Sequence, residues 1–233
     1  MLKENYDAVE ERVKQACERS GRDRSEVTLI AVSKTKPLSD LKEIYDAGAR
    51  DFGENKVQEL MDKIPEMPDD VRWHMIGHLQ RNKVKYLARY DNIVLIHSVD
   101  SYRLAEEINI FGKKLGKRMP ILIEVNAAGE TTKFGVSPED TLQLCEEISH
   151  VDGLDVRGLM TIAPYVTDPE DNREIFRKIK QLSVDIAKQN LDNISMDTLS
   201  MGMTGDFEVA IEEGSTIVRV GTGIFGERSY NLN

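Results

Sequence analysis

The chain has few cysteines, no long hydrophobic run and no excess of positive charge. Its two cysteines, Cys17 and Cys145, lie far apart and form no CxxC pair, which argues against a disulfide framework and against a zinc-site spacing. The longest apolar runs fall well short of the roughly 20 residues that span a bilayer, and the first residues are charged and amphipathic, unlike an export signal. We therefore expect a cytoplasmic protein without a membrane partner.

Basic residues are outnumbered by acidic ones. The sequence contains 31 Lys plus Arg against 41 Asp plus Glu, which gives a net charge of -10. A protein that holds a phosphate backbone through bulk charge needs the opposite balance, so we expect no nucleic-acid partner. The 233 residues, 40% of them hydrophobic, suit one α/β barrel, which typically has about 250 residues. No linker-like or low-complexity tract divides the chain.

Short apolar segments alternate with longer amphipathic segments throughout the sequence. The first reads VTLIAV, and its β-branched residues are typical of a strand. Eight such segments are predicted strands, at residues 27–33, 50–54, 71–77, 92–99, 119–126, 154–160, 196–201 and 215–221. The seven segments between them are predicted helices, at residues 41–49, 57–64, 82–90, 101–116, 138–148, 171–189 and 205–214.

This strict alternation predicts parallel βαβ units, because antiparallel hairpins need short turns that the sequence lacks. Continuous apolar runs such as ILIEV and IVLI suit strands that are covered on both faces. Eight repeats in a chain of this length are typical of a closed (β/α)8 TIM barrel. We predict that residues 1–233 form a single α/β barrel domain with an extra N-terminal helix. A doubly wound open sheet is the alternative.

A lysine follows the first predicted strand, at the barrel end where active sites lie. Lys34 shares its parity with Ile30 and Val32, so we expect its amine in the barrel mouth. Partial desolvation makes an amine more nucleophilic toward carbonyls, which is the requirement for a Schiff base. A solvated strand-end lysine is the alternative. Lys36, just before Pro37, is expected to be the exposed counterpart.

Glycine and hydroxyl residues follow the last two predicted strands. Phosphate-binding barrels generally use these two loops, because small residues let backbone N–H groups approach the phosphate oxygens. The residues are Ser200, Met201 and Gly202 after the seventh strand and Gly221, Thr222 and Gly223 after the eighth. Tight βα turns without a ligand are the alternative. Arg219 interrupts an apolar run and should be buried only against a polar partner.

Two histidines and one asparagine need a separate interpretation. His74 and His78 have the i, i+4 spacing of a helical metal pair, but the residues between them belong to a predicted strand and its loop. We therefore do not expect them to bind zinc. Asn55 is expected to be the N-cap of the helix at residues 57–64, with a side chain that can also face the pocket.

Seven motifs give the chain a resemblance to a known family. They are AVSKTKP, DFGENKVQE, WHMIGHLQRNK, IHSVDS, GLMTI, LSMGMTGDFEVAIEEG and VRVGTGIFGER. In this order they resemble the pyridoxal phosphate homeostasis protein family, of the YggS/PROSC type, over nearly the whole chain. The resemblance implies a barrel like the N-terminal domain of alanine racemase, with pyridoxal 5'-phosphate (PLP) bound as an internal aldimine on Lys34.

The same resemblance assigns site residues by their motif positions. The implied phosphate-binding residues are Ser200, the backbone of Met201, Gly221 and Thr222. Arg219 is implied to face the pyridine nitrogen, while Asn55 and His78 fall at the pocket by position. Lys133 in GETTKFG matches a lysine near the pocket mouth that is linked to cofactor handling. Lys56 and Phe134 depart from the family pattern only at variable positions.

The resemblance further implies a role in intracellular PLP homeostasis, with PLP-dependent apoenzymes as partners and little or no catalytic turnover. A guanidinium beside the pyridine nitrogen disfavours protonation of that nitrogen, so the ring is a weaker electron sink. Alanine racemase also draws a second acid/base from another domain, and we expect none here. A PLP-dependent racemase or lyase is one alternative, and noncovalent binding of a phosphorylated metabolite is another. We expect a monomer, because no apolar surface for a racemase-like dimer is evident.

Overall fold

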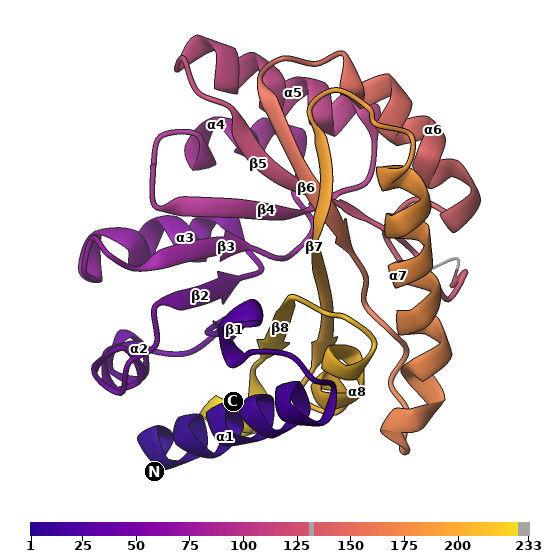
Figure 1. The fold of residues 1–233 in the computed structure, drawn as a ribbon. Coiled ribbons are helices and arrows are strands. Elements are labelled where there is room, and N and C mark those ends of the chain that lie inside the picture. The colour runs from indigo at the N-terminus through magenta and orange to yellow at the C-terminus, as the bar shows by residue number, and fades with distance from the viewer. Residues whose placement is uncertain (131–132, 228–233) are drawn as a thin grey trace.

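Eight parallel strands form a closed barrel in a computed structural model that describes residues 1–130 and 133–227. The strands follow one another around the barrel in sequence order (Figure 1). They are β1 (Thr28–Val32), β2 (Asp51–Glu54), β3 (Arg72–Met75), β4 (Ile93–Val99), β5 (Met119–Glu124), β6 (Leu154–Met160), β7 (Ile194–Met203) and β8 (Ile217–Val220). All eight predicted strands are confirmed.

The last strand pairs with the first and so closes the sheet. Ile30 of β1 lies opposite Arg219 of β8 in a parallel register, and each strand in between also pairs in parallel with the next. An open doubly wound sheet would leave two strand edges unpaired. The predicted (β/α)8 barrel is therefore confirmed and the open-sheet alternative is excluded.

Helices connect the strands and cover the outside of the barrel. They are α2 (Leu38–Asp46), α3 (Val57–Lys63), α4 (Val84–Leu87), α5 (Tyr102–Lys114), α6 (Pro138–Ser149), α7 (Arg173–Ala187) and α8 (Phe207–Glu212). The helix predicted at residues 82–90 is only one α-turn that follows a 3-10 turn at Arg81–Lys83. One turn is enough there to bury Val84 and Leu87, the apolar residues of α4. In the described chain no helix has both the length and the hydrophobicity to cross a membrane.

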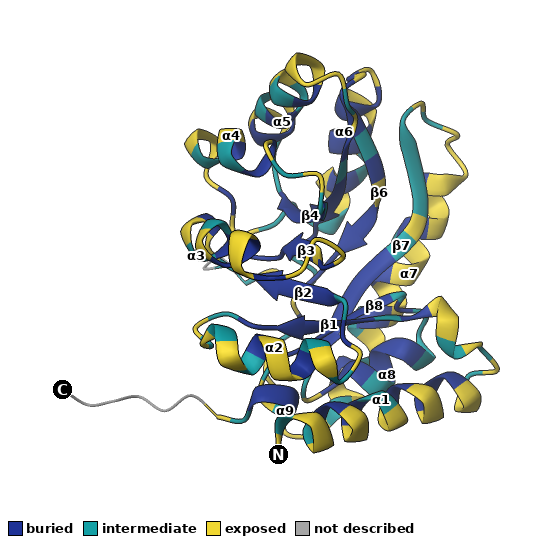
Figure 2. Cartoon of the chain, turned by 90° about the vertical axis from the view of Figure 1, so that its left-hand side faces the viewer, coloured by how far each residue is buried: buried dark blue, intermediate teal, exposed yellow. Residues whose placement is uncertain are grey.

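Two apolar cores lie on opposite faces of the sheet, as the continuous hydrophobic runs predict. The larger core lies between the strands and the helices, and Figure 2 shows the strands buried while the helices expose their outer faces. The smaller core fills part of the barrel interior. It consists of Ile30, Val32, Ile76, Leu95, Leu122, Met160 and Ile217. The alternation along β1 thus sends Ile30 and Val32 inward and Leu29 and Ala31 outward.

The N-terminal helix α1 (Leu2–Arg19) lies outside the repeat and runs alongside α8 (Figure 1). It buries Val9, Val13 and Cys17 in the outer core. Its exposed side is tied to α8 by Arg19, which bonds the carboxylates of Glu208 and Glu212. A short helix, α9 (Thr222–Phe225), follows β8 directly and also packs on α1; the sequence patterns did not predict it.

Gly158 allows β6 and β7 to approach each other closely. A Cβ at this position would lie 1.8 Å from the carbonyl oxygen of Thr198, its partner in β7. Gly158→Ala should therefore lower the free energy of unfolding by about 3 kcal/mol or more. At Gly205 a Cβ would have no heavy atom within 4 Å, so Gly205→Ala should change stability by less than about 1 kcal/mol. Urea denaturation monitored by circular dichroism compares them, and equal losses would contradict the strand contact.

Candidate functional site

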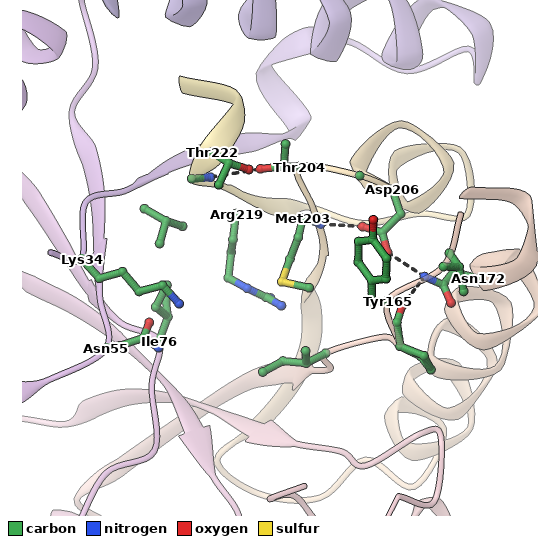
Figure 3. A pocket seen from close by; sticks show the side chains of 16 residues that line it. Lys34, Asn55, Ile76, Tyr165, Asn172, Met203, Thr204, Asp206, Arg219 and Thr222 are labelled. Atoms are coloured by element: carbon green, nitrogen blue, oxygen red, sulfur yellow. Dashed lines mark hydrogen bonds between the residues drawn. The ribbon is translucent and has the colours of Figure 1, made fainter. Parts of the chain in front are cut away.

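A cavity of about 450 Å³ opens at the C-terminal ends of the strands. Figure 3 shows side chains from β1, β7, β8 and the loops around them directed into it. Of the residues proposed from the sequence, it brings together Lys34, Asn55, Arg219, Gly221 and Thr222. Ile162, Tyr165, Met203 and Thr204 also line it. Small-molecule sites in proteins commonly have volumes of roughly 300 to 1,000 Å³.

Lys34 stands two residues beyond the end of β1. It keeps the inward parity of Val32, which lies beside it in the cavity wall. Figure 3 shows its amine extending into the cavity from the side opposite Met203 and Tyr165. The predicted position of the Lys34 amine in the barrel mouth therefore agrees with the structure.

The backbone on both sides of Lys34 is tied to a buried ion-pair network. The ammonium group of Lys63 donates to the Ser33 carbonyl oxygen at 2.8 Å and to the carboxylates of Glu54 and Glu59 at 2.8 and 2.7 Å. Ser33 Oγ donates to Glu54, and the N–H of Thr35 donates to Glu59. These bonds hold Thr35 at φ 65°, a left-handed conformation that is uncommon outside glycine. Hydrogen bonds to the backbone of Ser33 and Thr35, the residues on either side, therefore fix the direction in which the Lys34 side chain leaves the main chain.

Lys36 points elsewhere. Its ammonium group donates to the carbonyl oxygen of Phe225 at 2.9 Å, at the end of α9. The side chain is half-buried, so the expectation of an exposed lysine is wrong, because the end of α9 supplies acceptors that the sequence does not reveal. Lys36 nevertheless lies outside the cavity lining, which makes it a matched control for Lys34.

Arg219 forms part of the cavity floor and is 5% exposed. Its guanidinium donates one hydrogen bond to Ser200 Oγ at 2.5 Å and another to the Thr161 carbonyl oxygen at 2.9 Å. Burial lowers the pKa of Arg219 to about 10, so the group remains charged at neutral pH. The expectation that this arginine is buried only against polar partners is confirmed.

The loops after β7 and β8 meet at Thr204. Its hydroxyl oxygen accepts weak hydrogen bonds from the backbone N–H groups of Gly221 and Gly223, at 3.3 and 3.4 Å. Two backbone donors thus converge on one oxygen, and Figure 3 shows Thr204 beside Thr222. Converging N–H and O–H donors are the arrangement that holds phosphate oxygens.

Ser200 and Met201 do not line this cavity, in contrast to the sequence-based assignment. β7 continues to Met203, so both residues lie within the strand. Ser200 is buried between Arg219 and His97, and Met201 belongs to the outer core. Met203 and Thr204 take the places at the mouth. The turn-forming sequence TGD that follows Met203 is the signal that would have placed the loop correctly.

Asn55 lines the main cavity and also a smaller neighbouring one that contains His78. Its predicted role as an N-cap is wrong: Lys56 occupies that position, and no side chain caps α3. His78 lies at the rim, where its ring stacks on Phe134 with the centroids 3.8 Å apart. Asn55 is thus at the site, while His78 lies beside it.

A further cavity, which shares Ile162 with the main one, contains Lys133 and Glu124. Lys133 forms an ion pair with Glu130 at 2.6 Å. Glu124, at the end of β5, was not singled out from the sequence, although a carboxylate that ends an apolar strand run is a recognisable signal. Burial raises the pKa of Glu124 to about 7, with Asp100 adding to the effect and Arg219 opposing it.

Comparisons with known proteins agree on one family. The family model described as alanine racemase, N-terminal domain, matches residues 5–229. The pyridoxal phosphate homeostasis protein of Aquifex aeolicus (strain VF5) is 47% identical over 228 residues, which are 97% of this chain and 98% of that protein. The Homo sapiens protein of the same name is 39% identical over 237 residues, covering 96% of this chain and 86% of that protein.

A solved structure extends the comparison to three dimensions. The structure of PipY from Synechococcus elongatus PCC7942 with PLP bound has a TM-score of 0.82 and 32% sequence identity to this chain. The match covers 97% of this chain and 100% of PipY. The similarity thus extends over the whole barrel.

The raised pKa of Glu124 predicts a pH-dependent stability. Glu124 titrates near 4.5 in the unfolded chain and near 7 in the folded protein. The folded state therefore holds the proton to higher pH, and the free energy of unfolding falls as the pH rises through this window. Between pH 5 and 8 the free energy of unfolding of the wild type should fall by about 2 kcal/mol more than that of Glu124→Gln.

Urea denaturation at both pH values measures this difference. Glu106→Gln, on an exposed part of α5, is the control and should keep the pH dependence of the wild type. The same pH dependence in Glu124→Gln and the wild type would contradict the buried, protonated state of Glu124.

Proposed function

Because the chain belongs to the pyridoxal phosphate homeostasis protein family, we propose that it binds pyridoxal 5'-phosphate and acts in PLP homeostasis. One observation carries the proposal. A single cavity contains the amine of Lys34, the guanidinium of Arg219 and the donors of Thr204, Gly221 and Thr222. These three kinds of group are complementary to the three polar parts of PLP, namely its aldehyde, its pyridine nitrogen and its phosphate.

The donor set around the cavity fits this cofactor. The hydroxyl groups of Thr204 and Thr222 line the cavity and are suited to bind the phosphate. The N–H of Gly221 makes only a weak bond to Thr204 Oγ1, at 3.3 Å, so a phosphate oxygen can take the place of that acceptor. Asn55 is positioned to contact the ring from the β2 side (Figure 3). The proposed contacts are thus Lys34, Asn55, Thr204, Arg219, Gly221 and Thr222. Ser200 supports the cofactor indirectly by accepting a hydrogen bond from Arg219, and Met201 does so by packing β7 against the outer core.

Lys34 is the residue that we propose forms a Schiff base with the cofactor aldehyde. The buried network of Lys63, Glu54 and Glu59 holds the backbone on both sides of this lysine. The amine therefore enters the cavity in a limited range of directions, which reduces the entropy that covalent attachment costs.

Arg219 favours holding the cofactor over using it in catalysis. When bound, PLP supplies an electron sink for carbanions at an amino acid Cα, and that sink is strongest when the pyridine nitrogen is protonated. A permanently charged guanidinium beside that nitrogen disfavours its protonation. We therefore propose that the protein carries the cofactor in the cytoplasm, for delivery to PLP-dependent apoenzymes, with little or no turnover. The monomeric state stays a prediction.

A PLP-dependent racemase or lyase remains the second candidate. The supporting observation is Glu124, a buried carboxyl near the mouth whose pKa of about 7 suits a general acid or base. Incubation of the PLP-loaded protein with a panel of D- and L-amino acids, followed by chiral chromatography, separates the two. We expect that the protein forms no more than one molecule of product per protein molecule. Multiple turnovers that Glu124→Gln abolishes would favour the enzyme.

The two lysines of the SKTK motif give the direct test of cofactor attachment. Lys34→Ala should lose the visible imine absorbance that forms on addition of PLP, because its amine is in the cavity. Lys36→Ala should keep most of that absorbance, because the Lys36 ammonium contacts Phe225 outside the cavity. A PLP titration monitored by absorbance measures both. Loss of the band in Lys36→Ala with retention in Lys34→Ala would refute the assignment.

A further inference from the structure

Five buried polar side chains form a continuous hydrogen-bonded chain across the barrel interior. It runs from Arg219 to Ser200 (2.5 Å), His97 (2.9 Å), His74 (3.0 Å) and Asp51 (3.0 Å). None of the five residues is more than 7% exposed. They come from β8, β7, β4, β3 and β2, so the chain joins the cavity floor to the opposite end of the barrel.

The two ends of this chain have fixed hydrogen-bonding roles. The guanidinium of Arg219 can only donate. Asp51, at the start of β2, accepts two hydrogen bonds from Arg72. Burial opposes its ionisation, but the hydrogen bonds from Arg72 and His74 hold the pKa of Asp51 below its ordinary value. Its carboxylate can therefore only accept.

These ends dictate the direction of every bond between them. His74 must donate from Nε2 to Asp51, which leaves its Nδ1 as the acceptor from His97 Nε2. The Nδ1 atom of His97 then accepts the hydroxyl proton of Ser200. All donors and acceptors are matched when both imidazoles are neutral and carry their proton on Nε2.

The reverse direction leaves groups unmatched. If His97 donated from Nδ1, Ser200 Oγ would accept from both His97 and Arg219, and no acceptor within hydrogen-bonding distance is found for its own proton in the described residues. His74 would then need a second proton to keep its bond with Asp51. Burial above all, with the Arg219 cation nearby, also holds the pKa of His97 well below its ordinary value, which favours the neutral form.

We propose that Ser200, His97, His74 and Asp51 are positioning residues that hold the Arg219 guanidinium toward the ring of the bound cofactor. Two of its N–H groups are committed to Ser200 and the Thr161 carbonyl, which fixes its plane and leaves other N–H groups for the cavity. This role rests on the proposed PLP binding. The orientation of the cofactor contact is thereby set from the far end of the barrel, where the side chain of Arg72 is 55% exposed.

The direction of the chain is tested in the ligand-free protein. Nitrogen-15 NMR of the imidazole rings distinguishes the two neutral tautomers. At pH 7.5 we expect His74 and His97 both to carry the proton on Nε2. A proton on Nδ1 of His97 would overturn the proposed direction, whether or not the protein binds PLP.

The positioning role is tested at the end of the chain farthest from the cavity. Asp51→Leu removes the acceptor of the His74 Nε2–H at similar side-chain size, so the preferred direction of the chain is lost. We expect the dissociation constant for PLP to rise about two- to tenfold, the range of one weakened hydrogen bond, and the His97 tautomer to change. Arg72→Gln leaves the Asp51 carboxylate in place and should shift the dissociation constant by less than about twofold.

A PLP affinity equal to that of the wild type in folded Asp51→Leu would overturn the positioning role. If Asp51→Leu does not fold, Ser200→Ala removes the link next to Arg219 with little loss of packing and carries the same expectation. Absence of an imine band in the wild type would defeat the proposed function and the positioning role with it. A band in the wild type together with a reversed tautomer would defeat this inference alone.

Discussion

A guanidinium inside a closed barrel must find its hydrogen-bond acceptors among the strands, because bulk water does not solvate it there. Arg219 meets this constraint through Ser200 and the Thr161 carbonyl. An unmatched buried charge would cost several kcal/mol, so the acceptors must persist in the folded state. The barrel interior accordingly divides into an apolar part around Ile30 and Ile76 and a polar part that contains Arg219.

The site at the mouth follows from the same closure of the barrel. Because β8 pairs with β1, Arg219 lies opposite Ile30 in the sheet, and Lys34 emerges beside the loop after β8. The network of Lys63 holds the turn after β1. A cation on the floor and an amine on the wall of one cavity are therefore consequences of strand order, which explains how residues 185 positions apart in the sequence form one site.

The sequence predicts the architecture well because the architecture depends on local patterns. Alternating apolar and amphipathic segments are enough to locate eight strands, and parity is enough to place Lys34. The predicted seventh strand ends two residues too early, at residue 201 instead of Met203. The prediction therefore assigns Ser200 and Met201 to the barrel mouth, where the structure has Met203 and Thr204. Strand ends depend on how far a neighbouring strand continues the pairing, and Met203 pairs with Arg219, a contact that no local pattern encodes.

Interactions between distant elements were equally inaccessible. Lys63 and Ser33 are separated by 30 residues, and His97 and Ser200 by 103, so neither contact leaves a periodic trace in the sequence. His74 was considered for a metal pair with His78, yet it bonds His97 and Asp51 inside the barrel while His78 lies at the rim. Their i, i+4 spacing has no meaning in a strand, where the two side chains do not form one helical face.

The central claim is that one lysine at the barrel mouth holds PLP. The most direct measurement is borohydride reduction of the PLP-loaded wild type, followed by proteolysis and mass spectrometry of the peptides. The account predicts one phosphopyridoxyl group per chain, attached to Lys34. A label on Lys36 or Lys133, or bound PLP that leaves no label after reduction, would contradict it.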